Sequence, residues 1–355
     1  MRSFAQGFLA RQPLGQSLVQ TVRLLGEYKG RQELFVRQSP HVLRTLRDAA
    51  VYASTESSNR IEGVVATPER VRALVTRRSE PRNRSEQEIA GYRDVLNTIH
   101  VHHGAMDLTP NLVLQLHRDL FQFAPGGGGR WKPADNQITE TRADGTTAVR
   151  FTPVPAHAVP EAMRRLHAEY ATALTAGEVE PLLLICAYVL DFLCIHPFRD
   201  GNGRMARLLT LLTLYQAGYE VGRYVPLEAL VEDTKESYYD TLYACSQGWH
   251  ESAHTLVPWW EYLLGVVLLT AFREFERRVG TLTARPGAKR DMIVDAVSRM
   301  SGEFRYGDLE RLLPAVSRPT INRVLRELRI RGVIQCIKAG RDATWAKLPA
   351  GGGDR

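Results

Sequence analysis

Cysteine is scarce in this sequence, and no two cysteines stand close enough together to form a metal-binding pair. Only four occur among 355 residues, and none belongs to a Cys-x-x-Cys motif: Cys186, Cys194, Cys245 and Cys336. Paired cysteines mark structural zinc sites, and dense cysteines mark the disulfide-stapled domains of secreted proteins. The scarcity therefore argues against both classes and fits a protein of the reducing cytoplasm.

Long uninterrupted hydrophobic runs are also lacking. The two most apolar stretches, residues 181–195 and 256–272, contain the acids Asp191 and Glu261. A membrane-spanning helix needs about 20 consecutive apolar residues, and the first residues, MRSFAQGFLARQPLGQ, lack the apolar core of a secretory signal. We therefore expect buried helices, no membrane partner and a cytoplasmic location.

Neither sign of charge dominates the whole sequence, but one end is basic. Lys and Arg number 46 against 39 Asp and Glu, and 44% of residues are hydrophobic, which excludes wholesale disorder. Residues 286–348 contain 13 Lys and Arg against 7 Asp and Glu. A basic terminal module is typical of a nucleic-acid contact, although a well-solvated surface helix gives the same excess.

Helical periodicity dominates the pattern of apolar residues from residue 17 to 277. The exception is residues 137–152, where two β-leaning runs flank Asp144 and Gly145, a pair suited to a tight hairpin turn. Residues 281–288 contain Gly and Pro and are expected to form a linker. The sequence thus predicts a mainly α-helical body with one β-hairpin.

One stretch, HPFRDGNGRMAR at residues 196–207, concentrates groups that bind and react with phosphates. An apolar helix leads into it and another leads out, so the Gly-Asn-Gly segment exposes backbone N–H groups at a helix N-terminus, which is an anion site. Arg204 and Arg207 share a face and present guanidinium forks to phosphoryl oxygens. Asp200 is suited to bind Mg²⁺, and His196 to accept a proton.

This stretch matches the signature of the Fic family, HPFx(D/E)GNGRxxR, at every defined position. The order of helices and hairpin over roughly residues 44–277 is also similar to that family. The resemblance implies a Fic-type helical core with a β-hairpin flap. It also implies a protein adenylyltransferase, which moves AMP from ATP to a hydroxyl on a target protein. Kinase-like relatives replace the two glycines of the motif, so their presence favours AMP transfer over phosphoryl transfer.

The resemblance also assigns roles to individual residues. His196 would deprotonate a Tyr, Ser or Thr hydroxyl, and Asp200 would hold Mg²⁺ between the α- and β-phosphates of ATP. Arg207 would contact the γ-phosphate. The remaining phosphate-binding residues implied by the motif are Gly201, Asn202, Gly203 and Arg204.

A second motif, SNRIEG at residues 58–63, fits the inhibitory pattern of the family, (S/T)xxxE(G/N). Ser58 and Glu62 stand one helical turn apart. A carboxylate delivered to Arg207 would pair with the guanidinium that the γ-phosphate needs. The position of the motif resembles the class with an N-terminal inhibitory helix. Two other interpretations stay open: Glu62 orients a water that removes AMP from a modified protein, or it is an ordinary solvated acid.

The hairpin at residues 137–152 would align the modifiable segment of the target by strand-type hydrogen bonds, unless it is an ordinary surface hairpin. Tyr238 and Tyr239 stand where relatives have aromatic residues near the adenine, and Tyr239 is our candidate nucleotide contact; both also suit a helix core. Self-modification and a homodimer stay open.

The basic C-terminal region follows the plan of a winged helix-turn-helix domain. Helices are expected at 290–300, 307–313 and 318–331, and strands at 332–337 and 343–348. Ser317 is placed to cap the third helix. The residues available to face DNA are Arg318, Thr320, Asn322, Arg323 and Arg326. Such domains also serve in dimerisation or protein docking, which the sequence does not separate from DNA binding.

Together these patterns predict three parts. Residues 1–104 form a helical region with the inhibitory helix, residues 105–280 the Fic catalytic core, and residues 286–349 the winged helix domain. The leading function is AMP transfer that uses ATP and Mg²⁺. The alternatives are a nucleotide-sensing, DNA-binding transcriptional regulator and removal of AMP dependent on Glu62.

Overall fold

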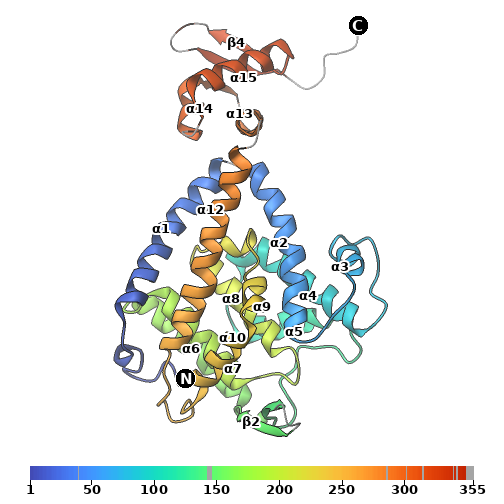
Figure 1. Ribbon diagram of the computed structural model, residues 1–355, viewed down its shortest axis with the longest axis vertical. Coiled ribbons are helices and arrows are strands. Elements are labelled where there is room, and N and C mark those ends of the chain that lie inside the picture. The colour runs from blue at the N-terminus through green and yellow to red at the C-terminus, as the bar shows by residue number, and fades with distance from the viewer. Residues whose placement is uncertain are drawn as a thin grey trace. The chain divides into compact units, whose positions relative to one another are not determined.

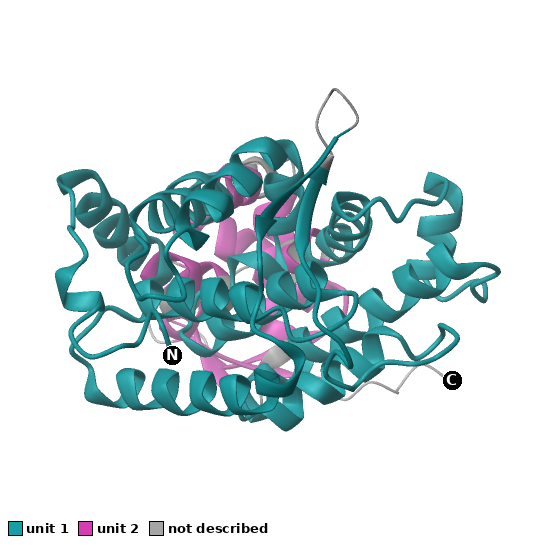
Figure 2. Cartoon of the chain, turned by 90° about the horizontal axis from the view of Figure 1, so that it is seen from below, with its two compact units in different colours: residues 1–29, 47–273 teal, residues 30–46, 274–355 magenta. Residues whose placement is uncertain are grey.

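The computed structural model describes residues 1–38, 40–141, 146–284, 287–300, 302–313, 316–338, 340 and 343–348. The chain is mainly helical, as the sequence predicts (Figure 1). It divides into two compact units, coloured separately in Figure 2: unit 1 is residues 1–29 and 47–273, and unit 2 is residues 30–46 and 274–355. The boundaries of these two units differ from those of the three parts expected from the sequence. That three-part division remains a prediction.

The secondary structure follows in chain order. The α-helices are α1 (Gln16–Gln38), α2 (Pro40–Ile61), α3 (Pro68–Val75), α4 (Arg84–His102), α5 (Pro110–Leu120), α6 (Val159–Ala176), α7 (Pro181–Ile195), α8 (Asn202–Gln216), α9 (Leu227–Asp233), α10 (Lys235–Ser246), α11 (Val257–Trp260), α12 (Leu269–Ala284), α13 (Ala288–Arg299), α14 (Tyr306–Leu312) and α15 (Arg318–Ile330). Short 3₁₀ turns are η1 (Leu9–Arg11), η2 (His103–Ala105), η3 (Ala156–Ala158) and η4 (Val221–Arg223), and η5 (Glu261–Leu268) is a π-helical segment. The strands are β1 (Ile138–Thr141), β2 (Thr147–Phe151), β3 (Glu303–Arg305), β4 (Ile334–Lys338) and β5 (Thr344–Lys347).

Helix α7 is the centre of unit 1. It packs between α6 and α8, and α8 packs against α4 (Figure 1). A helix that is apolar on every side must be buried, and nearly every residue of α7 is. The indole N–H groups of Trp259 and Trp260 donate to backbone carbonyls of α7, at 2.9 and 3.1 Å. These contacts fix the helix whose C-terminal end leads into the HPF motif.

The acid within α7, Asp191, is buried in a polar network rather than exposed. Its carboxylate accepts hydrogen bonds from the Ser3 hydroxyl at 2.6 Å and from the Trp249 indole at 2.5 Å. Burial raises the pKa of Asp191 to about 6, although these donors oppose the shift. The expectation of a buried helix at 181–195 is therefore confirmed. Along the described part of the chain, no helix is both long and apolar enough to cross a membrane.

The predicted hairpin is present as the antiparallel pair β1 and β2. Thr141 faces Thr147, and the register shifts between Ile138 and Thr139. The predicted turn residues Asp144 and Gly145 lie outside the described residues.

Unit 2 contains α13, α14, α15 and a three-stranded antiparallel sheet in the order β3-β5-β4. Side chains from all three helices and from β3 and β4 share one apolar core, which includes Ile293, Phe304, Leu309 and Val324. The sequence predicted two strands here, and β3 is an addition, because three residues are too short to show alternation. Residues 314–315, 339 and 341–342, which lie between the predicted helices and strands, are outside the described residues.

Two element boundaries differ from the sequence-based expectation. The predicted linker at 281–288 is helical through Ala284, and α13 begins at Ala288. In the sequence, no residue from Thr281 to Ala284 is a proline or glycine, so nothing in that part requires a helix to end. Helix α8 begins at Asn202, so two residues of the predicted Gly-Asn-Gly loop belong to its first turn.

Candidate active site

His196 stands at the point where α7 ends. Its backbone has the left-handed conformation (φ 50°, ψ 62°), and its N–H donates to the carbonyl of Phe192 at 3.0 Å. This conformation is uncommon for a residue with a side chain, and Pro197 cannot continue the helix. The chain therefore turns sharply here, and His196 lines a cavity.

The loop after His196 is held by Asn202. Its side-chain oxygen accepts from the N–H of Phe198 at 2.9 Å, and its side-chain nitrogen donates to the Phe198 carbonyl at 2.8 Å. The Phe198 ring is buried and stacks on His117, with ring centroids 3.6 Å apart. The resemblance implies that Asn202 binds phosphate, and the structure shows that its side chain closes the loop.

Asn202→Ala should lower the free energy of unfolding by about 2–4 kcal/mol, because the buried N–H and C=O of Phe198 would each lose a partner. Urea denaturation measures this difference. Asn97→Ala is the matched control, since Asn97 makes one bond to a helix carbonyl, that of Arg93. Equal stability losses in the two variants would contradict the role given to Asn202.

Helix α8 begins with a backbone suited to anions. Gly201 has φ 83°, a conformation that favours glycine, and no side chain caps the helix start. The first N–H groups of a helix lack intrahelical partners and carry the positive end of its dipole. A Cβ on Gly203 would overlap Oε1 of Glu62, so glycine at this position leaves room for an oxygen anion.

Glu62 supplies such an anion. Its Oε1 accepts from Nη2 of Arg207 at 2.8 Å, and Ser58 accepts from the same guanidinium through its hydroxyl and its carbonyl, both at 2.9 Å. Burial alone would raise the pKa of Glu62, but the neighbouring Arg207 outweighs it and the pKa falls below the usual carboxyl value. Glu62 is therefore ionised at neutral pH and paired with Arg207.

Contacts within unit 1 hold the segment that carries Glu62. Lys235 donates to the carbonyl of Ile61 at 2.9 Å, and Arg60 pairs with Glu56 at 2.7 Å and with Glu232 at 3.1 Å. The C-terminal end of α2 is thus tied to α9 and α10 of the same chain.

A cavity of about 250 Å³ lies between Glu62, His196 and Arg207. It opens between the start of α8, one face of α10 and the base of the hairpin. Its polar lining includes Glu62, His196, Arg207 and Arg150, and both predicted tyrosines, Tyr238 and Tyr239, line it as well. The structure thus brings the predicted base, the predicted inhibitory acid and the second motif arginine to one space.

The hairpin is tied to the rim of this cavity. Arg150 of β2 lies over the ring of Tyr243, with its guanidinium carbon 4.6 Å from the ring centroid, and approaches Asp240 at 3.5 Å. His250 stacks on Phe151, with ring centroids 5.4 Å apart. These contacts place the base of the hairpin beside α10.

His196 is neutral over the physiological range. Burial lowers its pKa to about 4, and the nearby positive charge of Lys132 acts in the same direction. Its Nδ1 is buried and has no hydrogen-bond partner in the described part of the chain. A neutral imidazole has one nitrogen able to accept a proton, as a general base requires.

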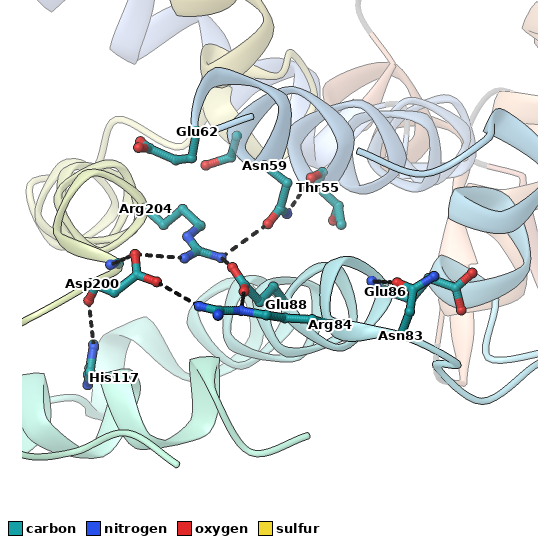
Figure 3. A network of polar contacts seen from close by, with 12 residues as sticks. Thr55, Asn59, Glu62, Asn83, Arg84, Glu86, Glu88, His117, Asp200 and Arg204 are labelled. Atoms are coloured by element: carbon teal, nitrogen blue, oxygen red, sulfur yellow. Dashed lines mark hydrogen bonds and ion pairs between the residues drawn. The ribbon is translucent and has the colours of Figure 1, made fainter. Parts of the chain in front are cut away.

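Arg204 and Asp200 lie together in a second polar cluster (Figure 3). Arg204 is 1% exposed and donates to Glu88 at 2.6 Å, whereas its distance to Asp200 is 3.5 Å. It is not among the residues that line the cavity. The structure therefore separates the two motif arginines: Arg207 faces the cavity, and Arg204 is bound to α4.

Asp200 presents an exposed carboxylate, the type of donor that Mg²⁺ binds. Its side chain is 54% exposed, and its backbone carbonyl is held by Nε2 of His117 at 3.0 Å. In the described residues, no three His, Cys, Asp or Glu side chains gather into a metal site. Mg²⁺ commonly binds through one or two carboxylates plus substrate phosphates and water. The donor set therefore fits a metal shared with a phosphate ligand and not a protein-only site.

Comparison with known proteins agrees with this geometry. Residues 107–214 match the Fic/DOC family. This part of the chain is therefore similar to a Fic domain. The matched range contains His196, Asp200 and Arg207, whereas Glu62 and Tyr239 lie outside it.

Relatives of the Fic domain are found among curated proteins and solved structures. A segment of 99 residues, 28% of this chain, is 29% identical to the protein adenylyltransferase fic-1 of Caenorhabditis elegans, but it spans only 18% of that protein's length. A Fic family protein from Desulfovibrio desulfuricans has a similar structure, with a TM-score of 0.61 and 24% identity over 97% of this chain and 98% of the other. A Fic domain signaling protein from Bacteroides thetaiotaomicron has the same TM-score, with 21% identity over 74% of this chain and 97% of the other. These structures establish a shared fold.

Sequence reasoning missed several residues around the Fic motif. Lys132 is buried, donates to Asn136 at 2.7 Å, and uses its backbone N–H to bind the carbonyl of Pro197 at 2.8 Å. His117 accepts from the N–H of Gly129 and so holds the loop on both sides. The only signal for Lys132 in the sequence is its place in the segment that leads to the hairpin.

The predicted DNA-facing residues lie on α15 in unit 2, and their surroundings differ. Arg318 pairs with Glu310 and lies over the ring of Tyr306, so its charge is already offset. Ser317 occupies the N-cap, but its hydroxyl meets the Thr320 hydroxyl at 3.0 Å and caps no backbone group. The remaining predicted residues, Asn322, Arg323 and Arg326, are exposed.

Proposed function

We propose that this chain is a protein adenylyltransferase that Glu62 holds inactive. The observation that carries the proposal is the 2.8 Å pair between Glu62 and Arg207 in the cavity that His196 lines. A neutral base, a guanidinium and a helix N-terminus around one cavity support nucleotide transfer. The pair supports inhibition, because a guanidinium engaged by a carboxylate is not free for a phosphate.

The proposed reaction is transfer of AMP to a Tyr, Ser or Thr hydroxyl of a target protein. The hydroxyl oxygen attacks the α-phosphorus of ATP, and the bond from that phosphorus to the bridging oxygen breaks. His196 accepts the hydroxyl proton, and pyrophosphate leaves with the electron pair of the broken bond. Arg207 would hold the γ-phosphate once Glu62 has withdrawn, and the N–H groups at the start of α8 would bind the other phosphates.

Asp200 would hold Mg²⁺, which when bound offsets negative charge on the phosphate oxygens. The hairpin would position the target, because an extended peptide that pairs with a strand edge is held in a defined register. Tyr239 and its neighbour Tyr238 would lie beside the nucleotide, as their place in the cavity lining supports.

The chemistry is tested by incubating Glu62→Gly with Mg²⁺, a cell lysate and ATP labelled at either the α- or the γ-phosphate. We expect protein to be labelled from the α-position only. Label from the γ-position would show phosphoryl transfer and overturn the proposed reaction. Incubation of AMP-labelled protein with the wild type separately tests removal of AMP, which would also use Glu62 and His196 and would release labelled AMP.

DNA binding by unit 2 is a second candidate function, and it could coexist with the first. Three helices around one core with a small antiparallel sheet support a winged helix-turn-helix domain. Arg323 and Arg326 are exposed on α15 and have no carboxylate within 4.0 Å among the described residues. Exposed arginines on a recognition-type helix are available for phosphates or bases.

Replacing Arg323 and Arg326 together by alanine should weaken binding of the full chain to random-sequence duplex DNA and reduce the salt slope of log K by about 2. Fluorescence anisotropy across a salt series measures both quantities. Arg331→Ala is the control, because that arginine is exposed but paired with Glu327 at 2.9 Å. Equal DNA affinity in the wild type and the double variant would remove the DNA-binding proposal.

A further inference from the structure

Four charged side chains form a closed ring of alternating sign beside the candidate metal ligand (Figure 3). Arg84 donates to Glu88 at 2.8 Å, Glu88 accepts from Arg204 at 2.6 Å, Arg204 lies 3.5 Å from Asp200, and Asp200 lies 3.4 Å from Arg84. The ring joins the first turn of α4 to the start of α8. Two members of the ring, Arg84 and Glu88, lie outside the Fic motif. Of these two, Arg84 has a largely exposed side chain, at 74%.

The two oxygens of Asp200 have different partners. Oδ1 accepts from the N–H of Gly201 at 2.6 Å and faces Arg204, so it is used within the loop. Oδ2 faces Nη2 of Arg84. Oδ2 is therefore the oxygen better placed for a metal ion, and a guanidinium already neighbours it.

The backbone under Arg84 is fixed, although its side chain is exposed. Asn83 caps α4 by accepting from the N–H of Glu86 at 3.0 Å, and Glu86 is paired with Arg70 at 2.6 Å. The Nε of Arg84 is held by Glu88. The Nη2 of Arg84 therefore lies beside Asp200 while the backbone of Arg84 is held in place. The exposed side chain still has room to move away.

We propose that Arg84 is a positioning residue that competes with the divalent cation for Asp200. Without metal, its guanidinium neutralises and orients the Asp200 carboxylate. A cation that binds Oδ2 must displace it, because two positive charges at one oxygen repel. The guanidinium of Arg84 thus competes with a metal ion for Asp200. This competition is separate from the contact of Glu62 with Arg207. This inference rests on the proposed assignment of Asp200 as the metal ligand.

The test uses Mn²⁺ as the probe, with ADP present and the full chain carrying Glu62→Gly. Free Mn²⁺, measured by electron paramagnetic resonance, gives the dissociation constant without any need for catalysis. Arg84→Met should bind Mn²⁺ about two- to fivefold more tightly, the range expected for loss of an exposed ion pair. Arg77→Met is the matched control for loss of charge, because Arg77 is 70% exposed and pairs with Asp94.

Two results would overturn the inference: Mn²⁺ affinity in Arg84→Met equal to or weaker than that of the Arg77→Met control, or affinity unchanged by Asp200→Asn. Failure of the proposed function is distinguishable, since it would appear as absent AMP labelling while Arg84→Met still tightened Mn²⁺ binding. Arg84→Lys, which keeps the positive charge, should restore part of the wild-type affinity. The inference is supported if Mn²⁺ binds more tightly to Arg84→Met but not to Arg77→Met, and if Arg84→Lys restores part of the wild-type affinity.

Discussion

Glu62→Gly should tighten ATP binding and raise the rate of AMP transfer, each by about ten- to a hundredfold. The substitution removes a charged hydrogen bond to Arg207. Such bonds contribute about 1.5–3 kcal/mol, and 1.4 kcal/mol corresponds to a factor of ten. Glycine is tolerated because residue 62 follows the last residue of α2. Isothermal titration with ATP measures the affinity, and initial rates of labelling from α-labelled ATP measure the transfer.

Two further variants make this result specific. Glu62→Gln keeps the size of the side chain but loses its charge, and it should give a smaller gain than glycine. Glu80→Gly makes the same exchange at an exposed acid in an irregular segment and should behave as the wild type. Equal ATP affinity in the wild type and Glu62→Gly would refute inhibition by this carboxylate.

Acidification should not reproduce the effect of Glu62→Gly. The pKa of Glu62 is lowered, because Arg207 offsets the upward effect of burial, so its contact is present at neutral pH and is lost only as pH falls below the usual carboxyl range. His196 has a pKa of about 4 and becomes protonated in the same acidic range. Release of the acid would therefore coincide with loss of the base. Transfer by the wild type should stay low from pH 8 down to pH 4.

His196→Ala in the Glu62→Gly background should lower the rate of AMP transfer by about 10²- to 10⁴-fold, the usual contribution of a general base. ATP affinity should stay within about twofold, because the phosphate-binding groups of α8 and Arg207 are untouched. Single-turnover labelling from α-labelled ATP measures the rate, and titration measures the affinity.

His157→Ala serves as the control for His196→Ala, because His157 is exposed in the short turn η3. It should leave both rate and affinity unchanged. A His196→Ala variant that kept a tenth or more of the transfer rate would show that another group accepts the proton. Loss of ATP binding in the same variant would instead show that His196 shapes the phosphate site.

The arrangement of the Fic motif was largely predictable because its parts are close in sequence. Proline after His196, glycine at 201 and an apolar helix on each side determine a turn followed by a helix N-terminus. The different roles of Arg204 and Arg207 could not be predicted from the sequence. Residues three apart on a helix point in directions about 60° apart, and packing against α4 decides that Arg204 meets Glu88 while Arg207 meets the cavity.

The contacts made by residues outside the motif could not be derived from local spacing. Glu62 and Arg207 are separated by 145 positions, and only a family pattern suggested that they meet. Lys132, His117 and Arg84 carried no periodic or compositional signal, because a single polar residue in a loop or at a helix end has many possible partners. The strand β3 was missed because it is three residues long.

The sequence by itself determined the helical character of this protein, the β-hairpin, the turn proposed to bind phosphate and the residue types proposed to react there. These features depend on periodicity and on local backbone chemistry, which neighbouring residues set. Only the tertiary structure decided which charges meet: Glu62 on Arg207, Glu88 on Arg204 and Arg84 beside Asp200. The physical reason is that an ion pair needs its atoms within about 4 Å, and the packing of α2, α4 and α8 brings them there.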